Sequence, residues 1–568
     1  MACIDISRLA DIARGLSIGR VTHSTSRDDV PVLIVGGSLV GLSTALFLAQ
    51  QGIRVLTIER HPGTAIHPRA GHLHLRTLEL MRSAGLEPAL QRLSAERYFP
   101  NGGINEVRTL AEGEIATFIP DLNQGVAEFS PSRRLFIAQD ALEPLLRERA
   151  EDLGATLRYN AEVMSVEQDA EGVTATVRDR GTGAVDRVRS RYAVAADGNR
   201  SPIRERLGIG MRGHGRLSHS ATIYFRADCR ELLRGTELGV IYVTNPALRG
   251  FFRFERTGDR GFLVVNTLGD PTVPGALDVT PGLTTDRAAA LVQAAIGLPD
   301  IPVRIDDIAE WVATADVAER YQADRIFLAG DAAHVVPPNG GFGGNTGIHD
   351  AHNLAWKLAM VVRGAAGEAL LDSYDAERRP AGELTVDQAY SRYRHRVTPE
   401  LMTDDVPDLV DDFSMEIGYR YRSAAILADP GAADDGAPAG HPRQAGGRPG
   451  TRAPHVELAS GRSTLDLFGS GFVLLTGASG RPWREAAAMA AQERLPVSAP
   501  EAGARSDAVA AAYGIGPDGA SLVRPDGFVG WRSRSGSPDP AADLGRALTA
   551  LLARSGMPAA TVPGARHS

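Results

Sequence analysis

The hydrophobic pattern of the chain begins with a short apolar run at residues 32–35 that ends in two glycines. A brief, uninterrupted run bounded by glycine is typical of a strand buried on both faces. Apolar residues then recur at helical spacing over residues 42–49, and a second apolar run at residues 53–58 ends at Glu59. This order of strand, helix and strand predicts a parallel α/β sheet covered by helices.

The pattern of apolar and polar residues changes in residues 211–270. Apolar and β-branched runs at residues 221–225, 239–243 and 261–265 are separated by glycine, asparagine, aspartate and proline. Runs of this length between turn-forming residues favour strands joined by short connections. We therefore expect an antiparallel sheet domain inserted into the α/β domain.

Helical spacing returns over residues 345–363, and residues 430–450 are rich in glycine, alanine and proline, as in a linker. Apolar runs at residues 472–475 and 521–523 predict two strands of a further unit. The expected divisions are an N-terminal extension (1–29), a discontinuous α/β domain (30–210 and 305–385), a sheet domain (211–304), a helical segment (386–429), a linker (430–450) and a C-terminal domain (451–568).

Length and charge narrow the classes of function. A chain of 568 residues exceeds what one hydrophobic core supports, so several domains are expected. The formal net charge of −8, without a long basic run, makes nucleic acid and anionic membrane surfaces poor candidate partners. No apolar run approaches the ~18 residues that a membrane-spanning helix needs.

The cysteine content indicates a reducing compartment. Cys3 and Cys229 are the only cysteines in the sequence. They exclude a disulfide framework, a multi-cysteine zinc site and a CxxC redox pair. We therefore expect a cytoplasmic protein without a cysteine-based metal site.

The turn after the first strand carries the first candidate chemistry, Gly-Gly-Ser-Leu-Val-Gly at residues 36–41, with Glu59 at the end of the next strand. Small residues there let the backbone approach a pyrophosphate at a helix N-terminus, and the carboxylate can bond ribose hydroxyls. Ser38 stands where the pattern GxGxxG has its second glycine, a departure that its small side chain tolerates. The strand-helix-strand context separates this motif from a merely structural turn.

Two further strands end in an aspartate beside glycine. Asp197 follows the apolar run at residues 192–196, and Asp331 follows the one at residues 326–329. Asp331 precedes a glycine-rich turn that leads into a helix, whose N-terminal amides can face an anionic ring while the carboxylate accepts a ribitol hydroxyl. A single Asp-Gly pair is usually only a turn, but three such motifs in this order indicate one bound dinucleotide.

The order of these motifs resembles that of the single-component, FAD-dependent aromatic hydroxylases typified by p-hydroxybenzoate and phenol hydroxylases. Within that family the chain looks most similar to aromatic polyketide hydroxylases, such as the aklavinone 11- and tetracenomycin-type hydroxylases. The segments that carry the resemblance include Pro-Arg-Ala (68–70), Gln-Asp-Ala-Leu-Glu (139–143), Asp-Ala-His-Asn-Leu-Ala-Trp-Lys-Leu (350–358) and Tyr-Asp-Ala-Glu-Arg (374–378).

This resemblance implies a Rossmann-like FAD-binding domain, an inserted antiparallel substrate domain and a C-terminal thioredoxin-like domain. The last contains no cysteine, so thiol chemistry is excluded there, and packing or self-association into a homodimer is expected. The cofactor-binding residues that the resemblance implies are Gly36, Ser38, Gly41, Glu59, Arg69, Gln139, Asp197, Asp331, Pro338, Gly343, Gly344 and Asn345.

The same resemblance implies non-covalent FAD, transient NADPH or NADH, and O2, with oxygen passing from a C4a-hydroperoxyflavin to a polycyclic phenol. This chemistry needs no metal. A base or cation beside the ring would make the phenol more phenolate-like. Tyr242 and Arg396 are the substrate-side candidates, against the alternative of a rim tyrosine and a solvated arginine. A Baeyer-Villiger or antibiotic-inactivating monooxygenase would share these motifs, as would a non-catalytic protein that binds flavin or another ligand.

Overall fold

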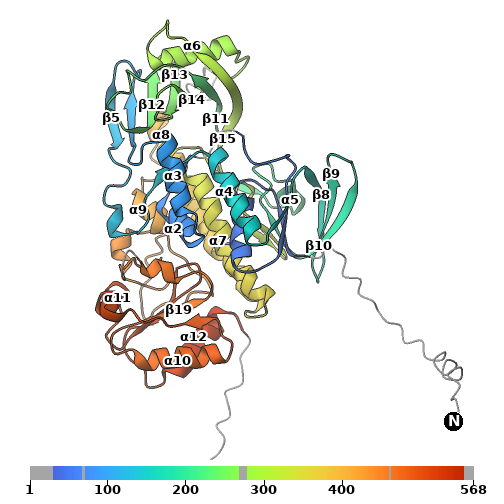
Figure 1. The fold of residues 1–568 in the computed structure, drawn as a ribbon, viewed down its shortest axis with the longest axis vertical. Helices are drawn as coiled ribbons and strands as arrows, with labels where there is room; N and C mark the ends of the chain where they lie inside the picture. Colours follow the sequence, from blue (N-terminus) through green and yellow to red (C-terminus); the bar gives the residue numbers. More distant parts are fainter. Residues whose placement is uncertain (1–29, 67–70, 268–277, 459–461, 555–568) are drawn as a thin grey trace, which may run out of the picture.

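The computed structural model describes residues 30–66, 71–267, 278–458 and 462–554. In Figure 1 a sheet domain with α6 (Thr285–Ile296) lies at the top, an α/β domain in the centre, and a C-terminal domain with α10 (Arg481–Gln492) at the bottom. The predicted extension (1–29) and Arg69 lie outside the described residues. The predicted α/β fold class is confirmed.

The central domain is built on a sheet whose core strands are parallel. β1 (Val30–Val35) lies between β2 (Val55–Ile58) and β10 (Val185–Ala195), and β10 pairs in turn with β17 (Ile326–Leu328). The apolar run at residues 32–34 is fully buried, as expected for a strand covered on both faces. The other strands of this sheet are β7 (Thr156–Arg158), β8 (Ala161–Gln168), β9 (Val173–Asp179) and β16 (Gln322–Ala323).

Helix α1 (Leu39–Gln50) connects β1 to β2 and packs against α4 (Gln139–Asp152) and α7 (Phe342–Val362). Helix α1 is buried along most of its length, and the hydroxyls of Ser43 and Thr44 donate hydrogen bonds to backbone carbonyls of the same helix. The remaining helices of the domain are α2 (Leu75–Ser83), α3 (Glu87–Arg97), α5 (Pro202–Arg206), α8 (Ser373–Arg396) and α9 (Asp412–Ile417).

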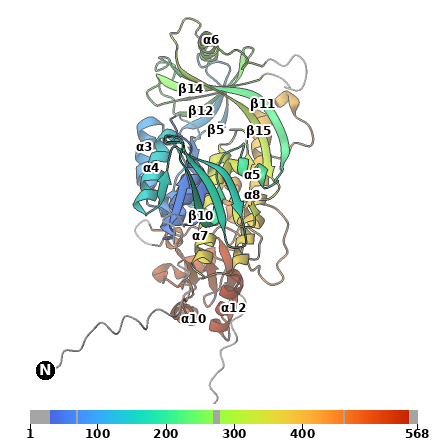
Figure 2. The ribbon, with the colours of Figure 1, turned by 90° about the vertical axis from the view of Figure 1, so that its right-hand side faces the viewer.

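The sheet domain has the strand order β18-β15-β11-β14-β13-β12-β4-β5. Figure 2 shows its two long strands, β11 and β15, descending toward the central domain. The strands are β4 (Gly103–Val107), β5 (Glu114–Ile119), β11 (Met211–Arg226), β12 (Leu238–Asn245), β13 (Leu248–Phe254), β14 (Arg260–Asn266), β15 (Arg304–Ala318) and β18 (His334–Val335).

The two faces of this sheet have different surroundings. Ile241, Phe252 and Leu263 pack with α6 residues such as Val292 in one apolar cluster. Side chains alternate along a strand, so the neighbouring residues face the central domain instead. This second face, which we call the inner face, is the one that can meet a cofactor held by the central domain.

The sheet extends beyond the expected boundaries of 211–304. β4 and β5 come from the segment before it, and β4 pairs with β12 in parallel, so the sheet is mixed rather than purely antiparallel. Helix α8 likewise runs across the expected boundary at residue 385. Both differences arise from pairing and packing between segments that are distant along the chain, which local patterns do not reveal.

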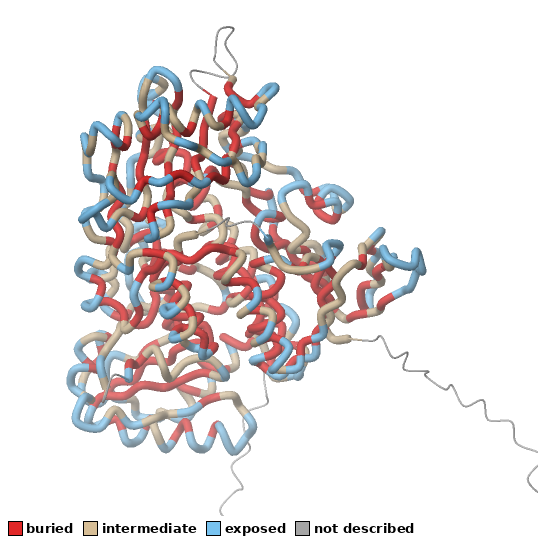
Figure 3. The backbone as a smooth tube through the Cα atoms, turned by 45° about the horizontal axis from the view of Figure 1, so that its top comes forward, coloured by how far each residue is buried: buried red, intermediate tan, exposed pale blue. Residues whose placement is uncertain are grey.

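The C-terminal domain has the strand and helix order of a thioredoxin-like fold. A parallel βαβ unit precedes an antiparallel strand pair and a final helix, as predicted. Its further elements are β19 (Phe472–Thr476), β20 (Val497–Ser498), α11 (Ser506–Ala512), β21 (Ala520–Val523), β22 (Val529–Ser533) and α12 (Pro540–Leu551). Its strands form part of the buried interior that is red in Figure 3.

Across the described ranges, no helix combines the length and the apolar character that crossing a membrane requires.

Candidate functional site

Four of the predicted cofactor residues lie at one edge of the central sheet. Gly36, Glu59, Asp197 and Asp331 follow β1, β2, β10 and β17, which run parallel to one another. Parallel strands present their carboxyl ends at the same edge, where ligands of open α/β sheets bind. The motifs are therefore gathered at the edge where a dinucleotide is expected.

Glycines let the three motifs approach each other closely. Gly36 has a φ of +104°, and a Cβ added to it would lie 2.1 Å from the carbonyl oxygen of Ala196, beside Asp197. Gly330, next to Asp331, and Gly347 of α7 both pack against Val40 of α1, where added Cβ atoms would lie 2.6 and 2.5 Å from its side chain. A larger side chain at any of these glycines would force the motifs apart.

Two helices begin at this edge without a side-chain cap. α1 follows Ser38, and α7 follows Gly341, whose φ is +70°; neither helix start has a capping side-chain hydrogen bond. Uncapped N-terminal amides attract anionic groups. The two helix starts and the acids at the strand ends thus fit the pyrophosphate, the pyrimidine edge and the hydroxyls of FAD.

Ser38 and Gln139 meet at a third residue, Glu143, which is fully buried. The Ser38 hydroxyl donates to Glu143 Oε1 at 2.6 Å, and Gln139 Nε2 donates to the same atom at 2.6 Å. The other oxygen, Oε2, accepts from the Ala65 amide at 2.6 Å. Glu143 thus orients both predicted residues, although sequence reasoning had noted it only as part of a shared segment.

The acidic residues differ in their surroundings. Glu59 accepts from the Gly37 amide at 2.6 Å, which holds its carboxylate against the first motif. Asp197 accepts from the Ser201 hydroxyl at 2.6 Å, and burial raises the pKa of its carboxyl above the usual range. Asp331 is exposed on a 3-10 turn between β17 and β18 whose other residues, Gly330 and Ala332, are buried.

The side chain of Asn345 holds the glycine-rich turn before α7 through hydrogen bonds. Its Oδ1 accepts from the His74 amide at 3.0 Å and the Thr77 hydroxyl at 2.7 Å, while its Nδ2 donates to the carbonyls of His72 and Gly341. Asn345 is buried, and its four side-chain hydrogen bonds hold the turn in position. Pro338 is exposed at the turn, and Gly343 and Gly344 lie in the first turn of α7.

The inner face of the sheet meets this turn at Tyr242. The Tyr242 hydroxyl accepts from Asn339 Nδ2 at 3.3 Å and from Arg396 Nη1 at 3.4 Å. The Arg396 guanidinium also lies over the rings of Phe118 and Tyr242, 5.0 and 5.5 Å from their centroids. The structure therefore brings the two substrate-side candidates together, next to the predicted flavin turn.

Comparison with known proteins covers the segments that carry these motifs. Residues 29–389 match the family described as FAD binding domain, and residues 446–555 match the one described as aromatic-ring hydroxylase, C-terminal. A 4-methyl-5-nitrocatechol 5-monooxygenase of Burkholderia sp is 63% identical, over 93% of this chain and 98% of that protein. The chain belongs to the FAD-dependent aromatic-ring hydroxylases. Tetracenomycin B2 monooxygenase-dioxygenase of Streptomyces olivaceus is 42% identical, over 93% of this chain and 99% of that one.

Structural similarity agrees with this assignment. The ternary complex of aklavinone-11 hydroxylase with FAD and aklavinone superposes with a TM-score of 0.86 at 38% identity, covering 92% of this chain and 99% of that one. The aromatic-ring hydroxylase described here is therefore an FAD-dependent monooxygenase, with NAD(P)H and O2 as the co-substrates of its class. The alternative of a non-catalytic binding protein is set aside.

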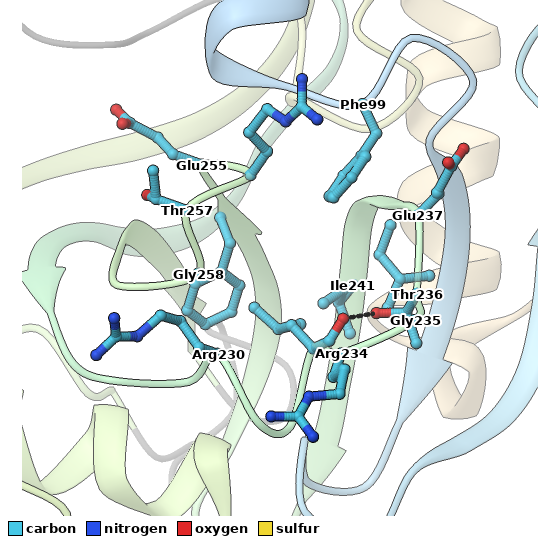
Figure 4. A pocket seen from close by; sticks show the side chains of 14 residues that line it. Phe99, Arg230, Arg234, Gly235, Thr236, Glu237, Ile241, Glu255, Thr257 and Gly258 are labelled. Carbon is cyan, nitrogen blue, oxygen red and sulfur yellow. Dashed lines mark hydrogen bonds between the residues drawn. The ribbon is translucent and has the colours of Figure 1, made fainter.

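A cavity of about 360 Å³ lies in the sheet domain of this hydroxylase, lined by Phe99 and by residues from 230–241 and 254–258. Figure 4 shows the Phe99 ring reaching into it, whereas the guanidinium group of Arg230 points away from its centre. Arg230 forms a salt bridge with Asp228 at 2.6 Å. Ile241 and Phe254, which line this cavity, belong to the face of the sheet that packs on α6 rather than to the inner face, so the cavity is not part of the oxygenation site.

Proposed function

We propose that this hydroxylase oxygenates a phenolic ring held between the inner face of the sheet and the turn that precedes α7. The observation that carries the proposal is the Tyr242 hydroxyl, which accepts hydrogen bonds from both Asn339 and Arg396. Because both neighbours are donors, the proton of the Tyr242 hydroxyl remains free to be donated to a substrate oxygen.

Bound FAD, reduced by NAD(P)H, would supply the activated oxygen atom. The chain's own residues would prepare the ring for it. Tyr242 would donate to a phenolate oxygen, and the positive charge of Arg396 would favour that anionic form of the substrate, which is the more electron-rich one. Aromatic side chains such as Phe251, which packs on Tyr242 with a centroid distance of 5.8 Å, would exclude water around the ring.

The favoured substrate class is a single-ring nitrocatechol. The relative that is 63% identical is named for oxygenation at carbon 5 of a catechol that carries its nitro group at that carbon. For this chain we therefore propose that a C–O bond forms at the nitro-bearing carbon, the C–N bond breaks, and nitrite leaves with the bonding electron pair. The nitrocatechol, O2, NAD(P)H and a proton would then give a hydroxyquinone, nitrous acid, water and NAD(P)⁺.

A polycyclic phenol is the second candidate substrate. It is supported by the similarity to aklavinone-11 hydroxylase and to the tetracenomycin B2 enzyme, whose names refer to polyketide substrates. A Baeyer-Villiger reaction would use the same framework but insert the oxygen atom beside a carbonyl.

The experiment is a comparison of 4-methyl-5-nitrocatechol with aklavinone as stimulators of NAD(P)H oxidation, under ¹⁸O2. We expect the nitrocatechol to stimulate oxidation, one nitrite to form per NAD(P)H, and one labelled oxygen atom to enter the product. Stimulation by aklavinone alone would favour the polycyclic reading, and a labelled ring-expanded ester would favour the Baeyer-Villiger reaction. A product without label would contradict all three.

A further inference from the structure

Arg253 occupies the inner face of the sheet close to Tyr242. Tyr242 of β12 pairs with Phe251 of β13, and Arg253 follows Phe251 by two residues. Residues two apart on a strand face the same side, and such diagonal neighbours lie about 7–8 Å apart. Arg253 and Tyr242 are therefore diagonal neighbours on the inner face of the sheet.

The Arg253 side chain is buried, with 5% of its surface exposed. Its guanidinium lies between the rings of Tyr98 and Phe136, 4.1 and 4.6 Å from their centroids. Glu255, a nearby carboxylate, instead pairs with Arg97 at 2.6 Å. Burial lowers the pKa of Arg253 from its usual value, as expected for a cation that desolvation penalises.

The free edge of this guanidinium has a specific geometry. Within the described residues, Nε and Nη2 of Arg253 are buried and have no hydrogen-bond partner. The same two atoms of Arg82 hold both carboxylate oxygens of Asp466, at 2.7 and 3.1 Å. The open edge of Arg253 is thus the one that binds two coplanar oxygen atoms side by side.

His72 adds a third unpartnered nitrogen to this place. Its ring lies 5.1 Å from the same Phe136 ring, and its Nε2 is buried with no hydrogen-bond partner in the described part of the chain. Burial, and then the neighbouring His74, hold the pKa of His72 well below its usual value. A neutral imidazole can donate a hydrogen bond from one ring nitrogen without repelling the Arg253 charge.

A cavity of about 160 Å³ opens beside Arg253. Tyr224, Phe262 and Arg253 form a row across three paired strands and line it. Charged residues line the cavity as well, namely Arg97, Glu255, Arg260, Asp306 and Asp307. Glu255 and Asp306 pair with Arg97 and Arg226, so the cavity combines aromatic walls with charged groups and suits a flat ring that carries polar substituents.

We propose that Arg253, assisted by His72, forms a subsite that binds the nitro group of the substrate through its two oxygen atoms. The inference rests on the proposed function, in which Tyr242 meets a hydroxyl of the same ring. A nitro group matches the open edge because its two oxygens are coplanar and share the charge of the ionised catechol. Once oxygen has added at the nitro-bearing carbon, the departing nitrite would remain beside the Arg253 charge.

The test measures ligand binding to the FAD-loaded enzyme without NAD(P)H, from the perturbation of the flavin absorbance. The two ligands are 4-methyl-5-nitrocatechol and 4-methylcatechol, which differ only in the nitro group. We expect Arg253→Met to raise the Kd of the nitro ligand at least ~10-fold and that of 4-methylcatechol less than ~3-fold. Arg253→Lys, which keeps the charge but loses the fork, should fall between.

Arg256→Met is the matched control, because Arg256 lies just beyond β13 and is exposed. If Arg253→Met raised the Kd of both ligands equally, or of neither, the subsite would be overturned. Nitrite release by the wild-type enzyme would then leave the proposed function intact. If Arg253→Met fails to retain FAD, the ratio of the two Kd values in Arg253→Lys decides in the same way. A wild-type enzyme that releases no nitrite from the nitrocatechol would overturn the proposed function, and the subsite with it.

Discussion

At the scale of single residues, the hydroxyl of Tyr242 leads to the first prediction. Tyr242→Phe removes the proton that would reach the substrate oxygen but keeps the ring contacts with Phe118 and Phe251. A hydrogen bond to a charged group contributes about 1.5–3 kcal/mol, so kcat/KM should fall about 10- to 100-fold. A larger share of the NAD(P)H consumed should also yield H2O2, measured with a peroxidase-coupled assay.

Tyr390→Phe is the control for this change, because the buried Tyr390 ring stacks on His214, its hydroxyl accepts from Arg394 of the same helix, and neither partner belongs to a flavin motif. It should leave both kcat/KM and the H2O2 yield unchanged. If Tyr242→Phe behaves like this control, the hydroxyl has no part in the reaction.

Asp331 gives the second prediction at this scale. Asp331→Ala removes a carboxylate from the carboxyl edge of the central sheet, where it would accept a hydroxyl of FAD. The Kd for FAD should rise about 10- to 100-fold, as measured by fluorescence titration of the apoprotein. Asp331→Asn keeps an acceptor without the charge and should lose less. Equal Kd values for wild type and Asp331→Ala would remove Asp331 from the cofactor site.

The sequence was informative about some residues and silent about others for a physical reason. The position of Asp331 at the carboxyl edge of the central sheet could be predicted because its motif is local: an apolar run, an acid and glycines are adjacent along the chain. Arg253 could not, because its significance depends on Tyr98 and Phe136, which fold over it from distant segments. Glu143 was missed as a positioning residue for the same reason.

At the scale of elements, the junction between β1 and α1 depends on Gly41. A Cβ added there would lie 1.8 Å from the carbonyl oxygen of Gly36, and backbone cannot move aside cheaply. Gly41→Ala should therefore displace the start of α1 and yield protein with little bound FAD, measured as the ratio of flavin to protein absorbance. Gly63→Ala, where an added Cβ meets nothing within 4 Å, should retain full FAD content. Normal flavin content in Gly41→Ala would contradict the close packing described here.

The same scale shows where pattern reading succeeded and where it did not. β1, β2, β17 and the C-terminal part of β10 were predictable because strands buried on both faces are continuous apolar runs. β13 was missed because Arg249, Gly250 and Arg253 interrupt its aromatic residues. β4 and β5 join the sheet only through pairing with β12, which is distant along the chain.

At the scale of the whole molecule, a buried charge cluster joins the C-terminal domain to the central one. Glu377 of α8 accepts from Lys357 of α7 at 2.8 Å and from Arg524 of the C-terminal domain at 2.6 Å, and all three side chains are fully buried. Glu377→Ala would leave two buried cations without their shared carboxylate. Breaking such a cluster costs about 3–5 kcal/mol, so the midpoint of thermal unfolding and the temperature of flavin release should both fall.

Glu485→Ala removes the carboxylate of an exposed pair with Arg481 on α10 and should leave both temperatures unchanged. If Glu377→Ala lowered only the unfolding temperature of the C-terminal domain and left the temperature of flavin release unchanged, the cluster would not couple the two domains. A fall in both temperatures would mean that the cysteine-free domain contributes to the enzyme by keeping α7 and α8 in place; α7 begins at the flavin turn.

The two-sided sheet has a consequence for how such enzymes diverge. Residues that face α6 maintain the hydrophobic core, so their replacement is penalised whatever the substrate. Residues on the inner face, such as Phe251 and Phe262, can change without disturbing that core. Selection can therefore change the preferred substrate through residues on the inner face while residues on the other face keep the fold stable. Relatives that act on dissimilar aromatic compounds can thus share one fold.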